Sequence, residues 1–151
     1  MHSVLSVPSL FYETRPCAKA TIMVAEDSPD SREMMQLLLQ IKGYDVVSAG
    51  DGLSALEVAL RTVPDLILID LQLPKLDGLS VAQNLRRHPK TREVPIIVLS
   101  GHDPERYKQA AMAAGCNGYL LKPIDFDRLD HLLHRVISNH NGRSQNPDYS
   151  G

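Results

Sequence analysis

Several short apolar runs in this 151-residue sequence end at a residue whose side chain can take part in chemistry. These residues are, in chain order, Glu26, Asp27, Asp70, Ser100 and Lys122. Carboxylates bind hard divalent cations, while hydroxyl and ammonium groups can stabilise the oxygens of a phosphoryl group. The set is therefore typical of a site that handles phosphate with Mg²⁺, provided that the fold brings the five side chains together.

Three neighbouring carboxylates repel one another, so at least one of them would take up a proton unless a cation lay between them. Together with the Lys122 ammonium, the three acids sum to a charge of −2, which one Mg²⁺ balances. An aspartate carboxylate can act as a nucleophile towards phosphorus. Because Asp70 falls between the other groups, we predict that it accepts the phosphoryl group, with Ser100 donating a hydrogen bond to a phosphoryl oxygen.

The elements that must position these residues alternate between strand-like and helix-like patterns from about residue 20 to residue 138. Such alternation indicates a parallel sheet with helices on both faces. Five units favour an α/β, flavodoxin-like (βα)5 three-layer sandwich of strand order 2-1-3-4-5, whose ligand site lies at the carboxyl ends of the strands. The predicted strands are Thr21–Ala25, Tyr44–Ser48, Leu66–Ile69, Pro95–Leu99 and Asn117–Leu121.

Local signals mark the first and last helices. Ser28 and Pro29 have the types expected at the N-cap and first position of the first helix, and Gly43 fits the position after its end. We expect the last helix to begin after Asp125 and to end near residue 138. The apolar stripe of the first helix, with both methionines in or near the core, is predicted to be Met34, Met35, Leu37, Leu38 and Ile41.

The sequence predicts one domain over residues 19–138, with short flanking segments on either side. Residues 1–18 show no clear period and are predicted to be an irregular extension, and residues 139–151 are predicted to be a polar, disordered tail. Neither segment has the length of an ordinary folded output module. We therefore expect a stand-alone domain that acts through another protein.

Composition narrows the classes of partner and compartment. The formal net charge is −2, which gives no general electrostatic reason to bind nucleic acid or a membrane surface. The apolar runs are far too short to span a bilayer. Two cysteines without a CxxC pattern predict a reducing, cytoplasmic location.

Four segments at the ends of the first, third, fourth and fifth predicted strands carry a resemblance to a known family. They are Ala25–Ser28, Asp70–Gly78, Val98–Gly101 and Gly118–Pro123. In this order and spacing, the sequence resembles the receiver domain of two-component response regulators, including the chemotaxis regulators. The resemblance covers the whole span of roughly residues 20–138.

The resemblance implies that a histidine kinase or a phosphotransfer protein supplies phosphate to Asp70. It implies that Asp27 and Asp70 are Mg²⁺ ligands, that Glu26 acts through the water shell of the metal, and that Gln72 offers its backbone carbonyl. Lys122 is implied to pair with the phosphoryl group, and the peptide bond before Pro123 is often cis in this family.

Further roles follow from the resemblance. Ser100 and Tyr119 match a switch pair, in which the hydroxyl moves towards the phosphoryl group and the ring turns inward. Gln72 and His102 stand two residues beyond the acceptor and the hydroxyl, where they are expected to influence dephosphorylation. This sequence departs from the family pattern in having Glu26 where Asp is commonest, and Ser100 where Thr is also common.

The predicted function is that of a signalling protein rather than an enzyme, with residues 104–138 contacting a downstream effector protein. A phosphorelay intermediate, an inert pseudo-receiver and an aspartyl-phosphate phosphatase are the alternatives. Gln72 counts against the phosphatase, because such enzymes place a second Asp two residues after the nucleophile as a general acid. A DNA-binding regulator would need a helix-turn-helix or a basic patch, and neither is evident.

Overall fold

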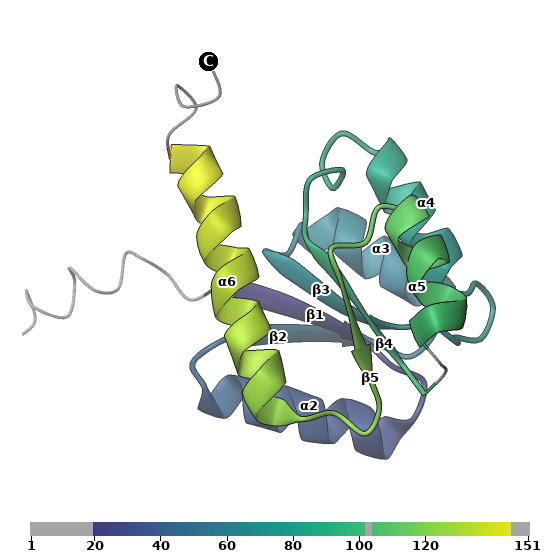
Figure 1. Ribbon diagram of the computed structural model, residues 1–151, viewed down its shortest axis with the longest axis horizontal. Helices are drawn as coiled ribbons and strands as arrows, with labels where there is room; N and C mark the ends of the chain where they lie inside the picture. The colour runs from purple at the N-terminus through teal and green to yellow at the C-terminus, as the bar shows by residue number, and fades with distance from the viewer. Residues whose placement is uncertain (1–19, 102–103, 146–151) are drawn as a thin grey trace, which may run out of the picture.

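A five-stranded parallel sheet forms the centre of the computed structural model, which describes residues 20–101 and 104–145, the last seven of these by backbone alone (Figure 1). The strand order β2-β1-β3-β4-β5 confirms the predicted flavodoxin-like arrangement. The strands are β1 (Thr21–Ala25), β2 (Asp45–Ala49), β3 (Leu66–Asp70), β4 (Ile96–Ser100) and β5 (Gly118–Leu121). The helices are α2 (Pro29–Ile41), α3 (Gly52–Thr62), α4 (Gly78–Arg87), α5 (Pro104–Ala113) and α6 (Phe126–Gln145).

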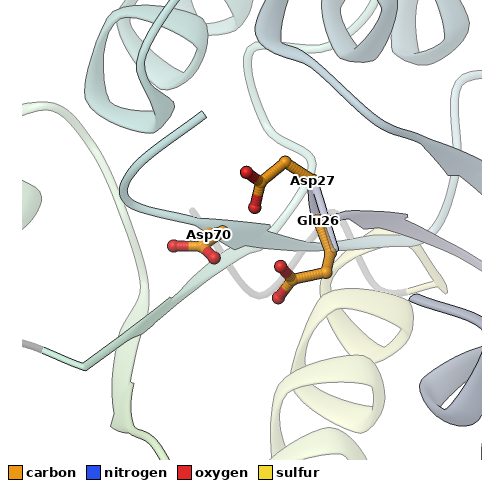
Figure 2. A group of neighbouring side chains, drawn as sticks. All are labelled: Glu26, Asp27 and Asp70. Carbon is orange, nitrogen blue, oxygen red and sulfur yellow. The ribbon is translucent and has the colours of Figure 1, made fainter. Parts of the chain in front are cut away.

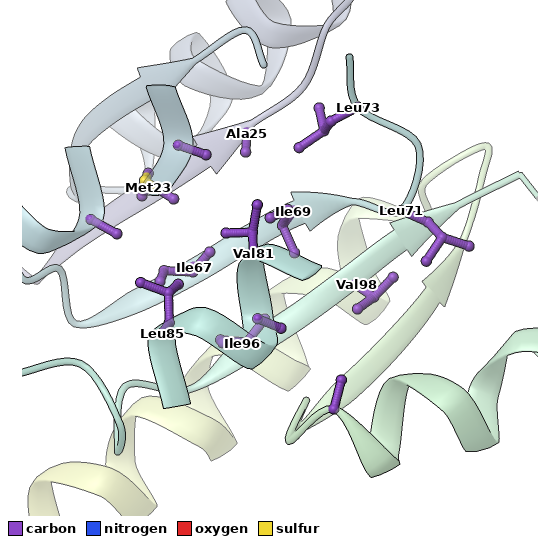
Figure 3. Close-up of a cluster of buried hydrophobic side chains, with 14 of the residues drawn as sticks. Met23, Ala25, Ile67, Ile69, Leu71, Leu73, Val81, Leu85, Ile96 and Val98 are labelled. Atoms are coloured by element: carbon purple, nitrogen blue, oxygen red, sulfur yellow. The ribbon is translucent and has the colours of Figure 1, made fainter. Parts of the chain in front are cut away.

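Helices cover both faces of the sheet, with α2 and α6 on one side and α3, α4 and α5 on the other (Figure 1). Successive strand residues point to opposite faces, so each strand feeds both layers. In β1, for example, Ile22 and Val24 pack against α2 and α6, while Met23 and Ala25 belong to the other layer (Figure 3). This alternation divides the apolar core into two clusters that share the sheet as a wall.

The central strands β3 and β4 are buried along their whole length. Strands buried on both faces read as continuous apolar runs, which is why Leu66–Ile69 and Ile96–Leu99 contain no polar residue. Each strand becomes polar only at its last residue, Asp70 in β3 and Ser100 in β4. The sheet therefore places these two side chains at its carboxyl edge.

Side-chain caps fix where three helices begin at this edge. The Ser28 hydroxyl accepts a hydrogen bond from the backbone N–H of Ser31, with Pro29 in the first turn, as the sequence predicts for α2. Carboxylates do the same for the next two helices, since Asp51 caps α3 and Asp77 caps α4. Each cap ends a loop that follows a strand, so the loops around the site have defined lengths.

The predicted apolar stripe of α2 is only partly correct. Met35 and Leu39 are its buried residues, whereas Met34 is 54% exposed, Leu37 is 55% exposed and Ile41 is 78% exposed. A helix lying on a sheet buries one narrow face, while the apolar residues of α2 extend around much of its circumference. Hydrophobicity alone could not show which of these residues would face the sheet.

The last helix continues past its predicted end. Backbone hydrogen bonds carry α6 to Gln145, so residues 139–145 of the predicted polar, disordered tail are helical. The apolar stripe stops at Ile137, but a helix needs no apolar face to keep its local hydrogen bonds, and no proline occurs between Pro123 and Pro147 to interrupt it. The predicted irregular extension over residues 1–18 and the rest of the predicted tail lie outside the described residues. Within the described ranges, every helix is too short or too polar to cross a membrane.

Arg86, near the end of α4, ties together the segments that lead into β4 and β5. Its Nε donates to the carbonyl of Gly115 at 2.9 Å, and its Nη1 donates to the carbonyls of Val94 at 2.7 Å and Thr91 at 3.2 Å. Its Nη2 donates to the side-chain oxygen of Asn117 at 3.0 Å. One guanidinium thus satisfies four acceptors from two neighbouring segments.

We predict that Arg86→Met lowers the free energy of unfolding by at least about 2 kcal/mol, because several partly buried carbonyls would lose their donor. Urea unfolding followed by circular dichroism measures this change. Arg87→Met is the matched control, since Arg87 is exposed on the same helix, and a change within about 0.5 kcal/mol is expected there. Equal effects of the two substitutions would contradict a clamp at Arg86.

Candidate functional site

Three acidic side chains meet at the carboxyl edge of the sheet. Glu26 and Asp27 follow β1, and Asp70 ends β3, the neighbour of β1 (Figure 2). One carboxylate oxygen from each residue lies within 4.8 Å of the others. Glu26 is only 2% exposed and Asp70 only 7%, while Asp27 is exposed to solvent. The prediction that these three residues come together is confirmed by their positions.

Lys122 bridges the two buried carboxylates. Its Nζ lies 2.8 Å from Glu26 Oε1 and 2.6 Å from Asp70 Oδ2. Burial by itself would lower the pKa of this ammonium group, but its hydrogen bonds to Asp70 and Glu26 outweigh that effect and leave the pKa raised. Lys122 therefore stays charged, and it reaches this position because it directly follows β5. The peptide bond between Lys122 and Pro123 is cis, as the family resemblance implies.

Backbone groups hold the remaining oxygens of these carboxylates. The N–H of Gln72 donates to Asp70 Oδ1 at 3.0 Å, and the N–H of Ser28 donates to Glu26 Oε2 at 3.1 Å. Arg32 on α2 also contributes, because its Nη1 donates to the backbone carbonyl of Glu26 at 2.8 Å. The sequence analysis did not identify Arg32 as part of the site. The one signal for it in the sequence is its position on α2, three residues before the buried Met35.

Two glycines allow the loop after β3 to pack closely against neighbouring backbone. A Cβ atom at Gly78 would lie 2.3 Å from the backbone carbonyl oxygen of Asp70, and a Cβ atom at Gly52 would lie 1.7 Å from that of Leu76. Gly78 also donates its N–H to the carbonyl of Leu71 at 2.9 Å. Both positions require glycine because the approaching atoms are backbone and cannot turn away. The loop after β3 is thereby packed against the starts of α3 and α4.

Of the other predicted site residues, the structure describes Ser100, Tyr119 and Gln72. Ser100 is fully buried at the end of β4, one residue beyond the pairing of Leu99 with Asp70. Tyr119 is half-buried on β5 and packs against the core cluster that includes α3, α4 and α5. Gln72 is exposed beside Asp70. His102 lies outside the described residues.

The donor set suits a hard divalent cation. Oxygen atoms from three carboxylates face one another, and within the described part of the chain Lys122 is the cation that pairs with two of them. This leaves a charge of −2 in a site where two of the acids are almost wholly buried. Mg²⁺ favours this kind of partial carboxylate shell, with water and phosphate oxygens as its other ligands.

The doubly wound sheet, with an acidic cluster and a bridging lysine at its carboxyl edge, defines the class of protein as a flavodoxin-like α/β domain. Within that class, the family model described as the response regulator receiver domain matches residues 22–134. The chain therefore belongs to the response regulator receiver family. It is a signalling domain of the two-component type, and the alternatives of a phosphorelay intermediate, a phosphatase and a pseudo-receiver are not favoured.

The sequence is also similar to regulators from other organisms. The chain is 36% identical over 115 residues to the "DNA-binding dual master transcriptional regulator RpaA" of Synechocystis, covering 76% of this chain and 46% of that protein. It is 34% identical over 112 residues to the "Polar-differentiation response regulator DivK" of Brucella anthropi, covering 72% and 88%. The chain thus spans about half the length of the first of these regulators.

One similar solved structure contains a magnesium ion. The receiver domain of the sensor histidine kinase PA1611 from Pseudomonas aeruginosa is 35% identical to this chain with a TM-score of 0.74, over 80% of this chain and 99% of that domain. That structure contains a magnesium ion coordinated in its active-site cleft. In the present chain, the acidic cluster lies at the carboxyl edge of the sheet, where β1 and β3 end side by side.

We predict that Gly78→Ala lowers the free energy of unfolding by about 1–3 kcal/mol, since the added methyl group would collide with the Asp70 carbonyl. Urea unfolding again measures the change. Gly101→Ala is the control, because a Cβ atom there would meet nothing within 4 Å. If Gly78→Ala were as well tolerated as Gly101→Ala, the loop would not depend on this close approach.

Proposed function

We propose that Asp70 is the phosphoacceptor of this receiver and that a phosphohistidine of a kinase or phosphotransfer protein is the donor. The observation that carries the proposal is the pairing of the buried Asp70 carboxylate with Lys122, beside two further acids. In the transfer, an Asp70 oxygen forms a bond to phosphorus while the bond from phosphorus to the donor imidazole breaks. The imidazole leaves with that electron pair, and Asp70 becomes an acyl phosphate.

The surrounding residues serve this transfer by position and charge. Lys122 sits where it can pair with phosphoryl oxygens, and the Gln72 N–H fixes the orientation of the Asp70 carboxylate. Asp27 and Asp70 would hold Mg²⁺ directly, Glu26 would act through its water shell, and Gln72 would add its backbone carbonyl. Bound Mg²⁺ would offset the charge of the carboxylates and of the incoming phosphoryl oxygens.

Ser100 and Tyr119 are proposed to report the phosphorylated state. Ser100 would donate its hydroxyl to the phosphoryl group, and Tyr119 would turn further inward beside it. The two residues stand on the paired strands β4 and β5, so a change at one can bias the position of the other. The surface of residues 104–138, which includes α5, β5 and the first part of α6, would then contact an effector protein.

The donor protein needs a contact surface next to Asp70, and α2 supplies one. A hollow of about 250 Å³ there is lined by site residues and by apolar side chains of α2 and α6, among them Glu26, Lys122, Met34 and Phe126. The exposed side chain of Leu37 lies one turn beyond Met34 on the same helix. We assign this face to the phosphodonor because it adjoins the proposed acceptor Asp70.

The cytoplasmic location of the protein remains a prediction from its cysteine usage.

We predict that wild-type protein gains the mass of one phosphoryl group when incubated with Mg²⁺ and a small-molecule phosphodonor, and that Asp70→Asn gains none. Intact-protein mass spectrometry measures the addition. Asp127→Asn is the control, since it removes one exposed carboxylate away from the site and should leave labelling intact. Labelling of Asp70→Asn to the wild-type extent would refute the assignment, as would an unlabelled wild type.

A second prediction concerns the lifetime of the phosphorylated protein, which we assign to Gln72 and His102. Replacing both by Ala should change the decay rate by about tenfold, equivalent to ~1.4 kcal/mol in activation free energy. The decay of the phosphorylated mass after removal of the phosphodonor gives the rate. Gln83→Ala with His88→Ala is the matched control, because these residues are exposed on and just after α4. An unchanged decay rate in the Gln72 and His102 variant would exclude the assignment.

A further inference from the structure

Asp27 is the exposed member of the acidic cluster, and it lies in the short connection between β1 and α2 (Figure 2). Within the part of the chain that the structure describes, no hydrogen bond or ion pair holds its carboxylate. Glu26 and Asp70 differ, because Lys122 and backbone N–H groups hold both oxygens of each carboxylate. The position of Asp27 must therefore be set by the backbone on either side of it.

Arg32 on α2 holds the carbonyl groups of both neighbours of Asp27. Its Nη1 donates to the carbonyl of Glu26 at 2.8 Å, and its backbone N–H donates to the carbonyl of Ser28 at 2.9 Å. The side chain can reach back in this way because Arg32 is in the first turn of the helix, and helical side chains lean towards the N-terminus. The Glu26 carbonyl shares a rigid peptide plane with the N–H of Asp27, so the contact also fixes where Asp27 begins.

Gly50, which follows β2, leaves the space that this guanidinium group occupies. A Cβ atom at Gly50 would lie 2.9 Å from Arg32 Nη1 and 3.6 Å from Arg32 Cζ. The strands β1 and β2 stay paired up to this point, since the N–H of Glu26 donates to the carbonyl of Ala49 at 3.1 Å. A larger residue at Gly50 would displace the movable end of the arginine side chain and leave the backbone where it is.

Charge and position would give Arg32 opposite effects on a metal site. A cation near an acidic cluster opposes the binding of a second cation, so on charge alone its removal should strengthen Mg²⁺ binding. Mg²⁺ demands nearly ideal octahedral geometry, so the loss of a contact that orients one of its ligands should weaken binding. The sign of the change therefore separates the two roles.

We propose that Arg32, seated over Gly50, is a positioning residue that holds Asp27 where it can bind Mg²⁺. The proposal rests on the proposed function in that it takes Asp27 as a ligand of the metal. Arg32 acts through the backbone of Glu26 and Ser28. The connection between β1 and α2 is thereby ordered before the metal binds.

The test is the Mg²⁺ affinity of the full chain, measured by titrating MgCl₂ and following the amide shifts of Asp27, Ser28 and Gln72 in NMR spectra. Arg32→Met removes the donors of the side chain and should weaken binding about tenfold, as is usual when a residue that orients a metal ligand is lost. Gly50→Ala should weaken binding in the same direction by displacing the guanidinium. In the double variant Gly50→Ala should add nothing further, because the group that it displaces is absent.

Two controls separate positioning from charge and from a general loss of stability. Arg61→Met makes the same change of charge in the exposed last turn of α3 and should bind Mg²⁺ like wild type. Arg86→Met is expected to destabilise the fold and to leave the Mg²⁺ affinity of the folded protein unchanged. Urea unfolding of each variant gives the stability against which its affinity is compared.

Unchanged or stronger Mg²⁺ binding by Arg32→Met or by Gly50→Ala would overturn the proposal, as would additive effects in the double variant. Asp27→Asn tests the premise, and it should weaken binding at least as much as Arg32→Met. If Asp27→Asn binds Mg²⁺ like wild type, the ligand assignment and the proposal both fail. If Asp27→Asn loses affinity while Arg32→Met keeps it, only the role of Arg32 fails. Labelling of Asp70, measured by mass, tests the phosphoacceptor separately.

Discussion

The contact of Lys122 with Glu26 and Asp70 is the interaction on which the site depends. These three residues follow or end three different strands, β5, β1 and β3, and two of them are almost completely buried. Burying two carboxylates side by side is unfavourable unless a cation lies between them. Lys122 meets that requirement, and in doing so it joins the edge strand of the sheet to its centre.

The loop after β3 depends on this arrangement in turn. Asp70 can face Lys122 only if the chain turns sharply beyond the strand, and the turn is held by the Gln72 N–H and by the close approach of Gly78. The cap residue Asp77 then starts α4 immediately after the loop. The ion pair between Asp70 and Lys122 therefore depends on the backbone packing of the loop beside it.

Much of this could be predicted from the sequence, because the relevant signals are local. Continuous apolar runs such as Leu66–Ile69 identify buried strands, and the residue at the end of each run is at the carboxyl edge whatever the details of packing. The strand order followed from counting five strand–helix units. The grouping of Glu26, Asp27 and Asp70 followed from that order without any knowledge of distances.

The features that escaped prediction depend on contacts between distant segments. The buried face of α2 was misjudged because apolar residues extend around that helix, and the contact with the sheet selects Met35 over Met34. Arg32 and Arg86 look like ordinary surface residues until their acceptors are known. The extension of α6 to Gln145 was missed because amphipathic patterning reports packing, whereas the helix continues on backbone hydrogen bonds alone.

The Arg86 contacts also bear on how the sheet can move. They fasten the amino ends of β4 and β5, whereas Ser100 and Lys122 stand at the opposite ends of the same strands. The carboxyl ends are held separately, because Lys122 pairs with Glu26 and Asp70 and donates its backbone N–H to the carbonyl of Ser100 at 2.7 Å. The two strands are thus fastened at both ends by unrelated contacts, with neutral carbonyl acceptors at one end and ionised carboxylates at the other, so a change of charge at the site acts on one end alone.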